Sequence, residues 1–85
     1  MANPSFMLTE IGETAEAILE SGQGGAELTR RYLLGMAMLG HLGAGDAARA
    51  RAVWDKFSKP ALGGRPPDFA LDLLRAHAFA PEAGR

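Results

Sequence analysis

The chain has 85 residues, a length that allows one domain. It is 47% hydrophobic with a net charge of −1, and it is rich in Ala and Leu but poor in Val and Ile, which favours an all-α fold. The absence of cysteine excludes disulfides, thiolate nucleophiles and cysteine-based metal sites, and it suits a reducing compartment such as the cytoplasm.

The charges are unevenly distributed along the chain. Residues 1–27 carry five acids and no base, whereas residues 28–85 carry nine bases and five acids. We therefore expect the two parts to attract each other within one fold. The longest apolar run is far shorter than the roughly 18 residues that span a bilayer, and no basic segment opens the chain, so we expect neither a membrane span nor a signal peptide.

The first predicted helix begins at Asn3 and Pro4, which are suited to capping and to the first turn. Apolar residues then recur at helical spacing on one face: Leu8, Ile11, Ala15, Ile18 and Leu19. Acids gather on the opposite face: Glu10, Glu13, Glu16 and Glu20. Such an acidic stripe is either solvated or forms salt bridges with a partner or with the chain itself. Ser21 and the glycines that follow end the helix.

The second predicted helix covers residues 26–42 and is apolar on nearly all sides from Tyr32 onward, which indicates burial on several sides. Gly35 and Gly40 lack side chains, so neighbouring helices can approach closely there. Gly43 is expected to adopt the left-handed conformation just past the helix end.

The third predicted helix covers residues 47–57, with Asp46 as its N-cap and Pro60 ending it. Pro66 and Pro67 open a fourth helix, with Asp68 in its first turn, that ends near Phe79. The sequence therefore predicts a compact four-helix array as a single domain over residues 1–81, followed by a frayed tail over residues 82–85.

The segment HLGAGDAARARAVWDKF resembles the second half of a tetratricopeptide repeat. Gly45 and Asp46 stand at its turn, Ala50 at the small position and Trp54 at the large aromatic position of its second helix. Without gaps the resemblance covers residues 31–64. It implies a helix-turn-helix at the centre of the array, structural roles for these four residues with Trp54 as the core aromatic side chain, and binding of peptides or proteins without catalysis. Because about three repeats are needed to stand alone, it also implies capping helices, a partner or self-association.

Two surfaces are candidates for binding a protein partner or a second copy of the chain. The acidic stripe of the first helix, Glu10, Glu13, Glu16 and Glu20, suits a basic partner. An apolar groove on the second and fourth helices is the other candidate, formed by Tyr32, Met36, Met38 and Phe69. Methionine suits such adaptable surfaces, but core packing is the favoured role for each of the methionines.

No motif in the sequence indicates catalysis. His41 and His77 are the only histidines, and a zinc site would need a third ligand supplied by the fold. We expect no enzyme activity, no cofactor and no metal, and we interpret the chain as a protein–protein interaction module or accessory subunit in the cytoplasm. A helix-turn-helix regulator that binds nucleic acid is the alternative, although the predicted third helix lacks the Asn, Gln, Ser and Thr that usually read base edges.

Overall fold

The computed structural model describes residues 4–22 and 25–80. They form four helices and no strand: α1 (Pro4–Ser21), α2 (Glu27–Gly43), α3 (Ala47–Leu62) and α4 (Phe69–Phe79). The prediction of an all-α, four-helix chain is confirmed. The expected cap at Asn3 and the tail over residues 82–85 lie outside the described residues.

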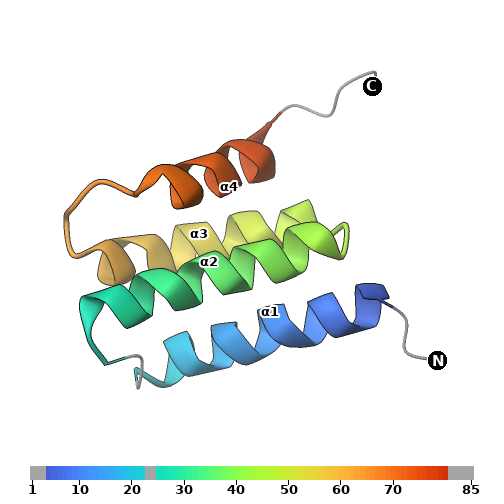
Figure 1. Ribbon diagram of the computed structural model, residues 1–85, viewed down its shortest axis with the longest axis horizontal. Helices are drawn as coiled ribbons and strands as arrows, with labels where there is room; N and C mark the ends of the chain where they lie inside the picture. The colour runs from blue at the N-terminus through green and yellow to red at the C-terminus, as the bar shows by residue number, and fades with distance from the viewer. Residues whose placement is uncertain (1–3, 23–24, 81–85) are drawn as a thin grey trace.

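The helices run alongside one another in alternating directions, from α1 at one edge to α4 at the other (Figure 1). Helix α2 contacts α1, α3 and α4. The molecule measures 36 × 32 × 18 Å, so the array is no more than about two helices deep. A body this thin leaves every helix with one face in contact with solvent.

The core gathers around α2. Leu34, Ala37 and Met38 of this helix are completely buried, which agrees with its apolar character on several sides. Met38 is therefore a core residue, the favoured role for the methionines, and it does not take part in an exposed groove. The buried apolar residues are Ala15, Leu33, Leu34, Ala37, Met38, Ala50, Val53, Phe57, Ala61, Leu62, Leu71 and Ala78.

Helices α1 and α2 come closest at two glycines. A Cβ atom on Gly40 would lie 2.6 Å from both the backbone nitrogen of Gly12 and the carbonyl oxygen of Leu8. A Cβ atom on Gly12 would lie 2.9 Å from Cε1 of His41. The expected close approach at Gly40 is confirmed. Gly12 has a packing role too, because its missing side chain leaves room for the imidazole ring.

The turn between α2 and α3 ends one helix and begins the next. The amide of Asp46 donates to the carbonyl of His41 and the amide of Gly45 donates to that of Leu42, a Schellman arrangement with Gly45 at φ +85°. Gly43 stays helical, so its predicted left-handed conformation is wrong and Gly45 takes that role. The Asp46 carboxylate then accepts from the amide of Arg49, as expected for an N-cap.

Helix α3 runs past Pro60, which was expected to end it. Pro60 lies inside the last turn, where it has no N–H to donate. The helix continues because Ala61 and Leu62 are buried in the core, and it ends at left-handed Gly63. Helix α4 begins at Phe69, after Pro66 and Pro67, which were expected to open it: Asp68 lies just before the helix and its carboxylate accepts from the amide of Leu71.

Candidate functional site

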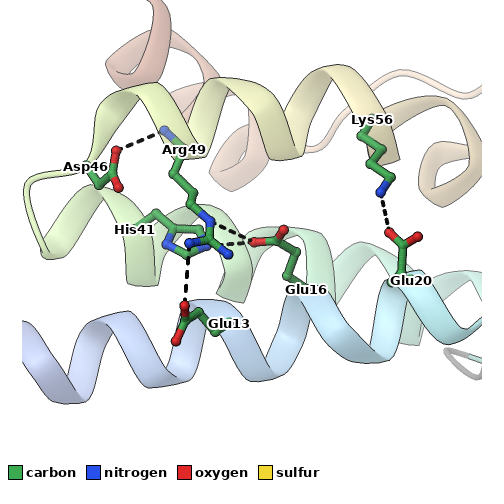
Figure 2. Close-up of polar contacts among 7 residues, drawn as sticks. All are labelled: Glu13, Glu16, Glu20, His41, Asp46, Arg49 and Lys56. Atoms are coloured by element: carbon green, nitrogen blue, oxygen red, sulfur yellow. Dashed lines mark hydrogen bonds and ion pairs between the residues drawn. The ribbon is translucent and has the colours of Figure 1, made fainter.

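The acidic stripe of α1 mostly faces the bases of α3 (Figure 2). A Glu13 oxygen lies 3.4 Å from Nη1 of Arg49, and Oε1 of Glu16 lies 3.5 Å from Nε of the same side chain. Glu20 forms an ion pair with Lys56. The stripe was expected either to be solvated or to form salt bridges with a partner or within the chain. Three of its four acids form salt bridges within the chain. The expected attraction between the acidic and basic parts of the chain is also confirmed.

His41 is buried beneath this network, with 1% of its surface exposed. Its Nε2 lies 2.9 Å from Oε1 of Glu16 (Figure 2). A buried imidazole needs such a partner, because an unsatisfied polar atom is costly in the interior. No buried side-chain nitrogen or oxygen among the described residues lacks a hydrogen-bond partner. The contact between His41 and Glu16 therefore fastens α1 to α2.

The arginines are also occupied within the chain. Arg51 donates to the carbonyl oxygen of Ala78 at 2.9 Å, which ties α3 to the end of α4. Each arginine in residues 25–80 contacts an acceptor of the same chain: Arg30, Arg31, Arg49, Arg51, Arg65 and Arg75. Nucleic-acid binding relies on basic side chains that are free to contact phosphates. This arrangement gives the nucleic-acid alternative no support.

The residues that resemble the tetratricopeptide pattern occupy structural positions. Ala50 is fully buried in the core, beside the turn formed by Gly45 and Asp46. Trp54 is only partly buried, and the guanidinium of Arg75 lies 5.7 Å from the centre of its ring. Trp54 thus packs towards α4, but it is less deeply buried than the core aromatic side chain that the resemblance implied.

Apolar side chains of α1, α2 and α4 line two neighbouring grooves that share residues, and we call this surface the apolar face. A groove of about 460 Å³ runs between α1 and α2, and a second of about 340 Å³ runs between α2 and α4. Tyr32 and Met36 line both grooves and join them. The apolar face comprises Met7, Ile11, Ile18, Leu28, Tyr32, Met36, Leu39, Ala70 and Leu74.

The exposure of these side chains is high for residues of their size. Tyr32 is 65% exposed, while Ile11 is 40% and Ile18 37% exposed. The sequence placed both isoleucines on the inner face of α1. They are half exposed because α1 approaches α2 closely at Gly12, which leaves the isoleucines at the side of the contact.

The structure thus brings together Tyr32 and Met36 of the predicted apolar groove, with Glu10 of the acidic stripe beside them. Phe69 is 83% exposed on α4 and does not line either groove. Sequence reasoning missed Leu28 and Leu39. Their positions four residues before and seven residues after Tyr32, on one side of α2, are the pattern that could have identified them.

Neither a metal site nor a membrane span is found in the part of the chain that the structure describes. Its His, Asp and Glu side chains form no group of three or more that could hold a metal ion. None of its helices combines the length and hydropathy needed to cross a bilayer. Comparisons with protein-family models, curated proteins and solved structures find no match for this chain.

Proposed function

We propose that this chain is a non-catalytic protein–protein interaction module and that the apolar face is its binding surface. The observation that carries the proposal is the continuity of the two grooves through Tyr32 and Met36. Large contiguous apolar patches are uncommon on soluble domains, and where they occur they typically bind partners. This face exposes large apolar side chains from both α1 and α2.

The chemistry of the shared residues supports the same function. Tyrosine offers a broad apolar ring with a polar end, and it is enriched among the residues that dominate binding energy at interfaces. Methionine is flexible and polarizable, so it adapts to the shape of a partner. Tyr32 and Met36 lie one turn apart at the junction of the grooves, where a partner contacting either groove meets both.

The resemblance to a tetratricopeptide repeat supports the choice of surface. In that family the first helix of each pair lines the binding surface, and α2 is the first helix of the matched pair. Helix α4 follows where the first helix of the next repeat would stand. The lack of cysteine supports placing the protein in the cytoplasm.

The test is site-specific photo-crosslinking in an extract of the source cells. Benzoylphenylalanine is introduced at Tyr32 in one variant and, as the control, at exposed Ala52 on α3 in another. We expect a discrete protein adduct from position 32 only. Excess unmodified wild-type protein should compete for it, whereas an Ile11→Lys competitor should not. Equal adducts from both positions, or competition by Ile11→Lys as effective as by wild type, would contradict the proposal.

A further inference from the structure

Of the charged side chains that line the two grooves, Glu10 alone makes neither a hydrogen bond nor an ion pair with the described residues. Glu10 lines the groove between α1 and α2 and makes no ion pair within residues 4–22 and 25–80. The other two charged residues on the face are engaged: Arg31 contacts Glu27 and a backbone carbonyl, and Asp68 caps α4. A partner that covers this groove must therefore bring a positive charge to Glu10 or leave a carboxylate unpaired at the interface.

The grooves also restrict the backbone conformation of the partner. The polar side chains that line the α1–α2 groove are Glu10, Thr14 and Tyr32, and the described residues present no strand edge. An extended peptide lying along the groove would bury backbone amides and carbonyls that three side chains cannot satisfy. A helix satisfies these groups internally and presents only its side chains. The surface is therefore suited to a helical partner.

A second copy of the chain fits this surface poorly. A symmetric dimer places the same residues on both sides of the interface. It would add a second Glu10 to the contact, and the arginine on this face, Arg31, is only 14% exposed and already contacts Glu27 and the carbonyl oxygen of Pro66. Two unpaired carboxylates on one apolar interface are unfavourable. The charge pattern favours a different protein.

We propose that the apolar face binds an amphipathic helix of another protein, which places a lysine or arginine beside Glu10; this inference rests on the proposed function. The groove residues of α1 extend from Met7 to Ile18, about 16 Å along the helix axis, or three turns. The partner helix therefore presents apolar residues at positions i, i+3 or i+4, and i+7, with one base at the edge of that stripe.

The probe is a displayed library of three-to-four-turn helices. Its apolar positions vary among Leu, Ile, Met and Phe, and one flanking position varies among Lys, Arg, Ala and Glu. The library is selected on immobilised wild-type protein and depleted on the Ile11→Lys variant. Because Ile11 and Glu10 are exposed, we expect these variants to keep the fold, and circular dichroism checks that they do. Ala52→Lys on α3 serves as the matched surface control.

We expect selected helices to carry Lys or Arg at the flanking position. Ile11→Lys should weaken their binding at least about 10-fold, Glu10→Gln about fivefold, and Ala52→Lys should leave it unchanged. Glu10→Lys should restore affinity for helices whose base is replaced by Glu.

The other outcomes separate the two proposals. Helices that bind the face with no preference for a base, or with affinity insensitive to Glu10→Gln, overturn this inference and leave the proposed function standing. A library that yields no helix sensitive to Ile11→Lys overturns the inference, and the crosslinking experiment then decides the function independently. A dimer of the wild-type protein that Ile11→Lys dissociates identifies a second copy as the occupant and also overturns the inference.

Discussion

Gly40→Ala tests the contact on which the α1–α2 pair depends. Alanine is normally favoured over glycine inside a helix by about 1 kcal/mol, so helix propensity alone predicts a more stable protein. Here the added Cβ would lie 2.6 Å from two backbone atoms of α1, the nitrogen of Gly12 and the oxygen of Leu8. Backbone atoms cannot rotate away as a flexible side chain can. Helix α1 must therefore move outward.

The cost of that movement exceeds the gain in propensity. Overpacking a well-packed contact costs about 1–3 kcal/mol, occasionally more, and this contact is at the unfavourable end because its atoms belong to the backbone. Moving α1 also lengthens the 2.9 Å hydrogen bond between His41 and Glu16, worth roughly 1 kcal/mol. We expect a net loss of about 2–3 kcal/mol, which lowers Tm by roughly 8–24 °C in a domain of this size.

Urea denaturation followed by circular dichroism at 222 nm measures this change. Gly35→Ala is the matched control, since it lies in the same helix and its Cβ would meet Leu71 at 3.5 Å, an ordinary contact. We expect Gly35→Ala to be stabilised by up to about 1 kcal/mol. A Gly40→Ala protein as stable as wild type, or stabilised like Gly35→Ala, would refute the close backbone contact between α1 and α2.

Three further substitutions test other contacts by thermal and urea unfolding. Glu16→Ala should cost about 1–3 kcal/mol because it leaves buried His41 without its partner, and Glu16→Gln should cost less than half as much; equal losses would contradict the hydrogen bond. Trp54→Ala should cost about 2 kcal/mol, below the 3–5 of a fully buried tryptophan, because Trp54 is partly exposed; complete unfolding would contradict that. Pro60→Ala should add about 1 kcal/mol by supplying an N–H to the last turn of α3, and a loss would contradict the helical path through Pro60.

Local signals in the sequence were sufficient for the helices and for most of their ends. Asp46 is an N-cap whose carboxylate reaches an amide three residues later, an interaction that depends on neighbouring residues alone. The end of α3 was harder to predict, because Pro60 opposes a helix locally while burial of Ala61 and Leu62 favours it. Tertiary packing decided where α3 ends, and the local sequence around Pro60 carries no information on that packing.

The candidate binding face was only partly predictable for the same reason. Tyr32 and Met36 were identified because they lie on an apolar helix with more apolar surface than one contact can cover. Ile11 could not be placed correctly, since its exposure depends on where α1 crosses α2, and that crossing is determined by Gly12 and Gly40. Glu10 of the acidic stripe lines the groove, whereas the other three acids contact side chains of α2 or α3. This division likewise depends on where α3 lies relative to α1.

The most direct test of the central claim is the molar mass of the purified protein, measured by light scattering on a sizing column at two concentrations. The claim is that four helices close one core and leave the apolar face open to a different protein. It predicts a mass of 9.0 kDa at both concentrations. A mass that rises to that of a dimer with concentration, and returns to 9.0 kDa in Ile11→Lys, would show that a second copy covers the face and would contradict the claim.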